Sequence, residues 1–261
     1  MKKKVALIQM DVTYGDPKVN FARVSKWVMD AATNSGADIV VLPELWDTGY
    51  DLSRFDVLAD KDAKATIEFL SDLAKELNVV IVGGSVAEQT EDGMRNTMLV
   101  VDQNGELVHK YSKLHLFQLM DEHLHLVEGQ DEAEFELNGV PSAGFICYDI
   151  RFPEWIRKSA LNGAKIMYVV AEWPKPRIDY WRVLLQARAI ENQCYVVACN
   201  RVGEDPKNEF GGMSLVVDPW GEIVAEANDH EKMILTEIDL DKVDEVRSRI
   251  PIFQDRREDR Y

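Results

Sequence analysis

The sequence predicts an α/β protein with layered architecture and mixed β-sheets. Short apolar runs typical of buried strands alternate with segments whose apolar residues recur at helical spacing. Two hairpin signals interrupt this alternation, at 98–108 and 215–225, so a purely parallel, doubly wound sheet is not expected. Of the 261 residues, 46% are hydrophobic and 29% are charged, which suits one large globular domain.

The first third of the chain contributes three expected strands and two expected helices. Val5–Met10 is the first strand, and Asp16-Pro17 then provides an N-cap followed by proline in the first turn of a helix. Apolar residues at helical spacing continue that helix until Gly36. The other expected elements are a strand at 39–42, a helix through 67–77 that Asp62 could cap, and a strand at 79–82 that Gly83-Gly84 should end.

The remainder adds two hairpins, three more strands and a long helix. The turns of the hairpins are Asn104-Gly105 and 218–221. Further strands are expected at 143–147, 166–170 and 195–198, with a helix from about 179 to 191. No Pro/Gly/Ser-rich linker divides residues 1–261, which predicts a single domain. The runs 36–41 and 163–168 resemble each other, and each is followed by a glutamate, Glu44 or Glu172. A chance likeness and a duplicated architecture explain this about equally well.

Charge and cysteine content restrict the partners and the compartment. Lys and Arg total 30 against 46 Asp and Glu, a net charge of −16, which disfavours nucleic acid and anionic membranes as partners. Val5–Met10 is too short for a signal peptide, and no later run is apolar enough to span a bilayer. Three irregularly spaced cysteines indicate a reducing compartment, so we expect a cytoplasmic protein.

Cys147 is the first candidate for chemistry. It ends an apolar run and is followed by a polar turn, a place where α/β proteins expose reactive groups. A helix beginning near Pro153 would aim N–H groups toward it and favour the thiolate. A free cysteine more often simply packs in the core, and Cys194 and Cys199, which flank an apolar strand, fit that description.

Glu44 and Lys113 are charged residues in apolar surroundings. Glu44 follows the buried strand at 39–42 and precedes Trp46, so partial desolvation suits it to act as a general base. A helix cap or a surface ion pair would explain it equally well. Lys113 stands among apolar and aromatic residues, which suggests a buried ammonium with a charged partner. Most lysines are nevertheless solvated surface groups.

Other catalytic or binding motifs have little support. His115, His123 and His125 could bind a metal, but a spacing of two residues faces opposite sides of a strand and no zinc motif accompanies it. The sequence lacks GxSxG, GxGxxG and GxxxxGK[ST], so serine-hydrolase, dinucleotide and P-loop functions are not indicated.

Taken in order, these segments resemble the nitrilase (carbon–nitrogen hydrolase) superfamily. The resemblance rests on Pro43-Glu44, on Lys113 to Phe117 and on Cys147 to Glu154, with further matches that span almost the whole chain. In that family the three segments carry the Glu, Lys and Cys of the catalytic triad. Glu122, by its position before Gly129, matches the family's second glutamate.

The resemblance implies a four-layer αββα sandwich of the nitrilase type, a cysteine amidase mechanism and a homo-oligomer. Cys147 would attack an amide carbon, Glu44 would act as the acid and base, and Glu122 would orient Lys113 or the substrate amide. Lys113 and the backbone N–H of Tyr148 would stabilise the oxyanion. No metal or organic cofactor is implied. Residues from about 245 to 261 are expected to form a C-terminal tail at an oligomer interface.

The segments from Ala171 to Arg177 and from Asn200 to Gly203 resemble the ω-amidase branch, which hydrolyses the terminal amide of 2-oxoglutaramate and related α-keto acid amides. True nitrilases of this pattern carry Cys-Trp-Glu where this chain has Cys147-Tyr148-Asp149, which favours amides as substrates. Arg177 or Lys175, beside Trp173, could bind the distal carboxylate of the substrate. For Arg151 we expect a structural ion pair.

Three alternatives differ in testable ways. The substrate could be an N-carbamoyl amino acid or the amide of deaminated glutathione, which differ from 2-oxoglutaramate in the pocket they need. A non-catalytic binding protein on this scaffold would lack a catalytic group, whereas Glu44, Lys113 and Cys147 are all present. A metal-dependent hydrolase would lose activity to chelators and keep it after thiol alkylation.

Overall fold

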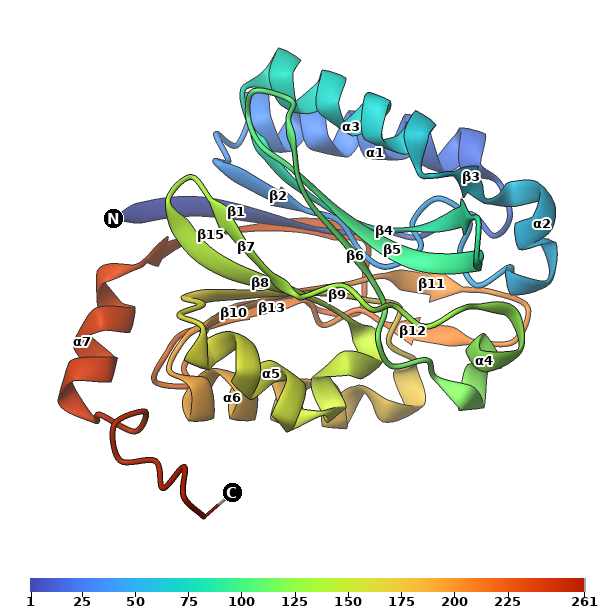
Figure 1. Ribbon diagram of the computed structural model, residues 1–261. Helices are drawn as coiled ribbons and strands as arrows, with labels where there is room; N and C mark the ends of the chain where they lie inside the picture. The colour runs from blue at the N-terminus through green and yellow to red at the C-terminus, as the bar shows by residue number, and fades with distance from the viewer. Residues whose placement is uncertain (261) are drawn as a thin grey trace.

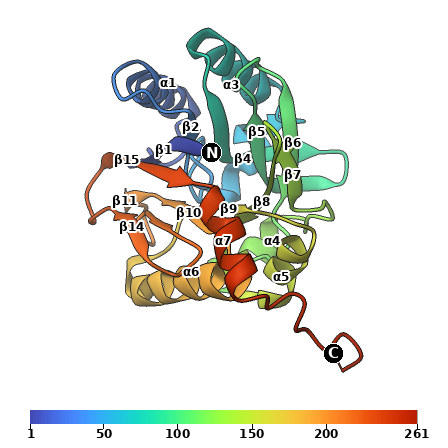
Figure 2. The same cartoon turned by 90° about the vertical axis from the view of Figure 1, so that its left-hand side faces the viewer.

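Two β-sheets pack face to face between two layers of helices (Figure 1). The computed structural model describes residues 1–260. Helices α1 and α3 cover the outer face of one sheet, and α5 and α6 cover the outer face of the other (Figures 1 and 2). This arrangement is the expected αββα sandwich with mixed sheets.

The first sheet combines parallel and antiparallel pairs. β1 is parallel to β2, and β2 to β4, whereas β15 and β5 run antiparallel to their neighbours. In spatial order its strands are β15 (Lys232–Asp239), β1 (Lys2–Gln9), β2 (Ile39–Val41), β4 (Val80–Thr90), β5 (Gly93–Val101) and β6 (Leu107–Ser112), with β3 (Asp60–Lys61) paired to β4.

The second sheet has a parallel centre and antiparallel edges. β8, β9 and β10 are parallel to one another, and the outer strands pair antiparallel with them. In spatial order its strands are β14 (Ile223–Glu226), β13 (Leu215–Val217), β10 (Tyr195–Asn200), β9 (Ile166–Ala171), β8 (Val140–Ile146) and β7 (Glu134–Leu137); β11 (Val202–Glu204) and β12 (Glu209–Gly211) form a separate pair.

The helices follow the expected sequence segments, with additional short ones. The α-helices are α1 (Pro17–Thr33), α2 (Phe55–Leu58), α3 (Lys64–Leu77), α4 (Glu122–His125), α5 (Pro153–Leu161), α6 (Ile178–Asn192) and α7 (Asp241–Arg249). The 3₁₀ helices are η1 (Leu52–Arg54), η2 (Gln118–Met120), η3 (Cys147–Arg151) and η4 (Lys175–Arg177). Within residues 1–260, none of the helices meets the length and apolarity that a membrane crossing requires.

Alternation along the strands explains why the central ones are apolar on both faces. Val5 and Leu7 of β1 pack in the core between the sheets, whereas Ala6 and Ile8 pack beneath α1 and α3. Side chains of a strand point alternately to its two faces, and here both faces are covered.

Two details of the expected structure were wrong. β4 does not end at Gly83-Gly84 but continues to Thr90 through a register shift between Val82 and Ser85. A Cβ on Gly84 would lie 2.0 Å from the carbonyl oxygen of Pro43, so the glycine lets the chain before Glu44 cross close to β4.

The start of α3 is the second detail. The N-cap residue is Ala63, which makes no side-chain hydrogen bond; the backbone N–H and the hydroxyl of Thr66, in the first turn, donate instead to the Asp60 carboxylate. Asp62 instead adopts a positive φ of 55° in the turn before the helix.

After α7 the chain leaves the body of the sandwich, and its C-terminal end projects away from both sheets (Figures 1 and 2). Ile250 is about half exposed at the start of this segment. Phe253 lies beneath the guanidinium groups of Arg157 and Arg247.

Candidate active site

The candidate residues come together where strands of both sheets end. Glu44 follows β2 and Lys113 follows β6 in the first sheet, whereas Cys147 follows β8 in the second. β2 and β6 run in the same sense, because β2 is parallel to β4 and β5 is antiparallel to both β4 and β6, so their C-terminal ends lie at the same edge of the first sheet. The C-terminal ends of such strands are the usual position of ligand sites in α/β sheets.

Glu44 is fully buried and both of its carboxylate oxygens accept hydrogen bonds. Oε1 accepts from Lys113 Nζ at 2.8 Å, from Asn96 Nδ2 at 2.8 Å and from the Tyr50 hydroxyl at 3.0 Å. Oε2 accepts from the backbone N–H of Glu172 at 2.7 Å. Oε1 is thus saturated with donors, and Oε2 keeps lone-pair capacity for one more proton.

Lys113 is a buried ammonium between two carboxylates. Its Nζ lies 2.5 Å from Glu122 Oε1 as well as 2.8 Å from Glu44 Oε1, and all three side chains are fully buried. Burial lowers the pKa of Lys113, but the charges of Glu122 and Glu44 outweigh it and raise that pKa well above its usual range. Lys113 therefore stays charged, as the sequence suggested.

Glu122 serves as an anchor for the loop that carries it. Besides Lys113, it accepts hydrogen bonds from the Tyr50 hydroxyl through Oε1 and from the Phe117 backbone N–H through Oε2, the latter at 2.6 Å. Burial raises the pKa of Glu122, Lys113 opposes that shift, and Glu44 reinforces it.

Cys147 begins η3 with a positive φ of 47°, a strained conformation that presents its side chain at the end of β8. It is 4% exposed. Burial raises the pKa of its thiol well above the usual range; Glu44 raises it further, and Lys113 lowers it less than these raise it. The expectation that a helix N-terminus favours the thiolate was therefore wrong, because desolvation and the carboxylates dominate.

Asp149 holds the turn that carries Cys147. Its buried carboxylate accepts hydrogen bonds from the backbone N–H groups of Ile146 and His115, at 2.9 and 3.1 Å, and from the Tyr111 hydroxyl at 2.8 Å. His115 Nδ1 lies 2.8 Å from the same carboxylate. The turn is thereby tied to the segment that begins with Lys113.

The three histidines do not converge. His115 pairs with Asp149 and stacks on Phe152, with ring centroids 3.6 Å apart. His123 and His125 lie exposed on α4. In the described part of the chain, no three His, Cys, Asp or Glu residues are grouped so that they could hold a metal ion.

The residues proposed to contact substrate have different surroundings. Arg177 lies with its guanidinium 5.5 Å from the centre of the Phe117 ring, and Trp173 is buried and donates its indole N–H to the Arg177 carbonyl at 2.8 Å. Lys175 is exposed and pairs with Glu209 at 2.6 Å. Trp173 thus supports the backbone of Arg177, and the ammonium of Lys175 is already paired with the Glu209 carboxylate.

Arg151 differs from expectation. Its guanidinium lies over the rings of Trp173 and Tyr180, 5.1 and 5.7 Å from their centres. Within residues 1–260 it has no carboxylate at ion-pair distance, so stacking on aromatic rings takes the place of the expected ion pair.

An open groove of about 740 Å³ runs beside the turn that carries Cys147. Phe117 and Tyr148 stand on its wall, their ring centroids 4.7 Å apart. The backbone N–H of Tyr148 lies in the first turn of η3, where N–H groups have no intrahelical acceptor. That position is compatible with an oxyanion donor next to Cys147.

The sequence analysis did not identify three groups of the site: Tyr50, Asn96 and the backbone N–H of Glu172. Tyr50 is buried, and burial together with Glu122 and Glu44 raises its pKa well above the usual range, so its hydroxyl stays a donor. A tyrosine and an asparagine without a motif carry no signal in one sequence. The glutamate that follows β9 had been noted only as an echo of Glu44. Cys194 and Cys199 are fully buried in the core, as expected.

Comparisons with known proteins agree with this geometry. A sequence profile of the family "Carbon-nitrogen hydrolase" matches residues 4–248. The chain is 49% identical over the full length of both proteins to a 2-oxoglutaramate amidase of Bacillus subtilis (strain 168). It is 38% identical to the Omega-amidase YafV of Escherichia coli (strain K12), over 97% of this chain and 96% of that protein. The crystal structure of Saccharomyces cerevisiae Nit3, a member of branch 10 of the nitrilase superfamily, superposes with a TM-score of 0.91 at 29% identity, over 100% of this chain and 97% of that one.

Proposed function

The chain belongs to the carbon–nitrogen hydrolase family, and on that basis we propose that it is an ω-amidase that hydrolyses 2-oxoglutaramate-like α-keto acid amides. The observation that carries the proposal is the fully buried contact of Glu44 with Lys113 beside the Cys147 thiol. The choice of substrate rests on the 2-oxoglutaramate amidase and the ω-amidase among its relatives.

In the first half of the reaction Cys147 attacks the amide carbon. Because the pKa of its thiol is raised by burial, the proton moves to Glu44 as the sulfur attacks, and Oε2 is the oxygen with capacity for it. The tetrahedral intermediate then collapses. Glu44 gives the proton to the leaving nitrogen, the C–N bond breaks, ammonia departs and a thioester remains.

The second half reverses these roles with water. Glu44 takes a proton from water as the water oxygen attacks the thioester carbon. The C–S bond then breaks, Glu44 returns the proton to sulfur and the carboxylate product leaves. The nucleophile and the base are both regenerated, and the reaction needs no further reactant.

Lys113 and Tyr148 supply the oxyanion donors. A lysine ammonium has three N–H groups. Two of those of Lys113 point to Glu44 and Glu122, and the third has only a weak 3.4 Å approach to the Tyr50 oxygen, so it is free to meet the oxyanion. With the Tyr148 backbone N–H as the second donor, each contributes about 10²–10³ in rate.

Arg177 is the cation that we propose for the distal carboxylate of the substrate. Its guanidinium lies against Phe117, a residue of the groove wall, and a guanidinium can bind a carboxylate through two hydrogen bonds. Lys175 is the weaker choice because Glu209 already neutralises it. Arg177→Leu should therefore raise the KM for 2-oxoglutaramate more than the KM for an uncharged amide such as butyramide.

The decisive experiment measures ammonia release from 2-oxoglutaramate and succinamate, with Cys147→Ala as control. Rapid release that the substitution abolishes is the expected result. Release from neither compound would refute the substrate and would direct the search to carbamoyl amino acids and peptide-like amides. Release that survives Cys147→Ala would refute the mechanism.

We also propose that residues 1–261 form one hydrolase domain that assembles as a homodimer or larger oligomer. The outer face of α6 exposes Tyr180, Val183 and Ile190, each more than half accessible, and the described tail, residues 245–260, ends in a segment that projects away from both sheets. Burying these apolar side chains would favour association. Light scattering should give at least twice the 29.8 kDa chain mass, and Val183→Glu should reduce it.

The cytoplasm is the compartment that fits this mechanism. Catalysis needs Cys147 as a free thiol, and all three cysteines of the chain are unpaired. A reducing compartment keeps them so. Fractionation of cells that express the tagged protein would test this location.

A further inference from the structure

Beyond the residues of the proposed mechanism, a buried pair connects the two sheets beside the active site. Arg201 directly follows β10, and Glu172 directly follows β9, both in the second sheet. Both side chains are fully buried, and Arg201 NH1 lies 3.2 Å from Glu172 Oε1. Nothing in the proposed chemistry uses either side chain.

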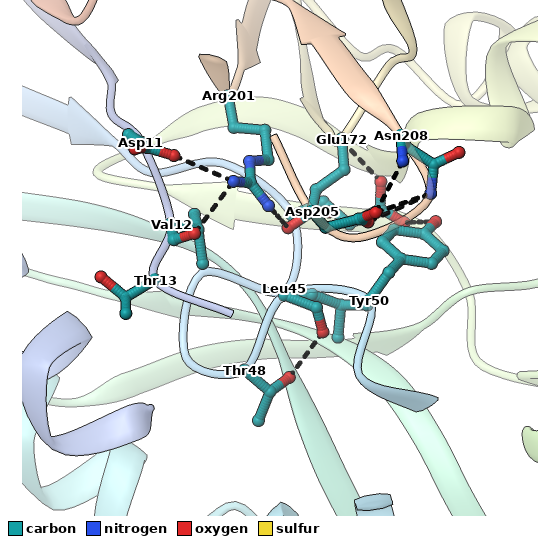
Figure 3. A network of polar contacts seen from close by, with 12 residues as sticks. Asp11, Val12, Thr13, Leu45, Thr48, Tyr50, Glu172, Arg201, Asp205 and Asn208 are labelled. Carbon is teal, nitrogen blue, oxygen red and sulfur yellow. Dashed lines mark hydrogen bonds and ion pairs between the residues drawn. The ribbon is translucent and has the colours of Figure 1, made fainter. Parts of the chain in front are cut away.

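Arg201 reaches across to the first sheet. Its NH2 group donates to the Asp11 carboxylate at 3.0 Å and to the Val12 carbonyl at 2.9 Å, just beyond the end of β1 (Figure 3). The backbone also joins here, because the Val202 N–H donates to the Met10 carbonyl at 3.1 Å. The guanidinium lies over Phe210, 4.2 Å from the ring centre. Arg201 therefore fixes the distance between the two sheets at this edge.

Glu172 links Arg201 to Glu44, the proposed catalytic base. Its backbone N–H is the donor to Glu44 Oε2, the oxygen that receives the thiol proton. The neighbouring backbone is held as well: Trp173 N–H donates to Asn200 Oδ1 at 2.7 Å, and Arg201 N–H donates to the Ala171 carbonyl at 3.1 Å. The N–H that orients Glu44 therefore belongs to a backbone segment that is tied on both sides to the strand end that carries Arg201.

The environment of the Glu172 side chain is costly to maintain. Burial raises the pKa of its carboxyl well above the usual range, Arg201 opposes that shift, and Glu44 and Asp205 reinforce it. Its Oε2 is buried without a hydrogen-bond partner among the described residues. A buried polar atom in this condition lowers stability, which is common where a side chain is kept for function.

From these contacts we infer that Glu172 and Arg201 are positioning residues: they hold Glu44, which belongs to the first sheet, in register with Cys147, which belongs to the second. The base and the nucleophile lie on opposite sides of the seam between the sheets. The distance between the base and the nucleophile therefore depends on the contacts between the two sheets. Arg201 makes such contacts, and Glu172 is its partner on the side of the active site. This inference rests on the proposed cysteine mechanism.

Arg201→Lys is the sharpest test. A lysine cannot bridge Asp11 and Glu172 with a planar fork, so Glu44 should move relative to the thiol. A misplacement near 1 Å costs about 10²-fold in rate, and we expect kcat to fall by about that factor with KM changed less than about threefold. Arg247→Lys is the matched control, because Arg247 is a part-buried arginine that bonds the Ala164 and Gln193 carbonyls away from the site.

Alkylation of Cys147 by iodoacetamide adds a readout that needs no substrate. In the wild type the rate of alkylation should rise with pH as the Cys147 thiol, whose pKa burial raises, loses its proton. Arg201→Lys should shift that profile, and Arg247→Lys should leave it unchanged even if both variants melt at lower temperature. An Arg201→Lys enzyme with wild-type kcat and an unshifted profile would overturn the inference.

If Arg201→Lys does not fold, two variants of Glu172 test the inference instead. Glu172→Gln keeps the volume and the oxygen that meets Arg201, whereas Glu172→Ala removes both. We expect the alanine variant to have a kcat at least about tenfold below that of the glutamine variant at equal KM. Equal kcat values would refute a positioning role. A wild type that releases no ammonia from any amide would refute the proposed function instead. The pH profiles of Cys147 alkylation would still test the positioning role in that case.

Discussion

The hydrogen bonds of Glu122 make Glu122→Gln a demanding test of the site. The wild-type carboxylate accepts from Lys113 and Tyr50 through Oε1 and from the Phe117 backbone N–H through Oε2. A glutamine offers one oxygen and one NH₂ group. In either orientation its NH₂ faces a donor, which is Phe117 N–H in one case and Lys113 in the other.

The size of the effect follows from this count. One buried donor loses its acceptor, which costs about 1–3 kcal/mol, and Lys113 keeps Glu44 as its only carboxylate partner. We expect the variant to unfold about 2–3 kcal/mol more easily than the wild type. Because Lys113 is the proposed oxyanion donor, its displacement should lower kcat by about 10²-fold.

Ammonia release from 2-oxoglutaramate gives kcat and KM, and chemical denaturation gives the free energy of unfolding. Glu136→Gln, on the exposed side of β7, is the matched control and should resemble the wild type in both. A Glu122→Gln enzyme with kcat within threefold of the wild type would refute the role assigned to Glu122. A variant that loses stability but keeps its kcat would show that Glu122 supports the loop and not Lys113.

Three further outcomes are expected. Burial raises the pKa of Asp47 to about 7 from 3.8, so its ionisation destabilises the fold as pH rises from about 4 to 7, by up to about 4 kcal/mol. Asp47→Asn should therefore be more stable than the wild type at pH 8 and equal to it near pH 4 in denaturation curves; a constant difference would contradict the assignment. Tyr50→Phe removes a donor to two carboxylates and should lower kcat by about tenfold in the same ammonia assay, with a wild-type rate counting against its role. Gly84→Ala places a methyl group 2.0 Å from the Pro43 carbonyl oxygen at a positive φ and should lower both Tm and kcat, whereas an unchanged Tm would show that the crossing is loose.

The sequence was sufficient for many of the elements and for the residues that motifs mark. Apolar runs and helical spacing placed β1, both hairpins and α6 within a few residues of their bounds, because these patterns depend on neighbours along the chain. Glu44, Lys113 and Cys147 were found because each lies in a short segment that resembles a known family. In the structure Lys113 and Cys147 directly follow β6 and β8, and Glu44 lies shortly after β2.

The sequence did not predict contacts between segments that are far apart along the chain. Asn96 lies 52 residues from Glu44 and the Glu172 N–H lies 128 residues away, yet both donate to the same carboxylate. β4 likewise continues through its glycines because the Pro43 backbone crosses it, a close approach that only the packed chain reveals. β15, which closes the first sheet beside β1, was missed because its burial depends on that distant partner.

Protonation and pairing were also decided by the tertiary structure. A helix N-terminus near Cys147 suggested a thiolate, but the raised pKa comes from desolvation and from carboxylates that folding brings to it. Arg177 and Lys175 were equivalent candidates until Glu209, 34 residues from Lys175, was seen to occupy the lysine. The sequence by itself determined which groups can react; the packing of the two sheets determined their charge, their partners and their spacing, because electrostatic free energies depend on burial and distance in three dimensions.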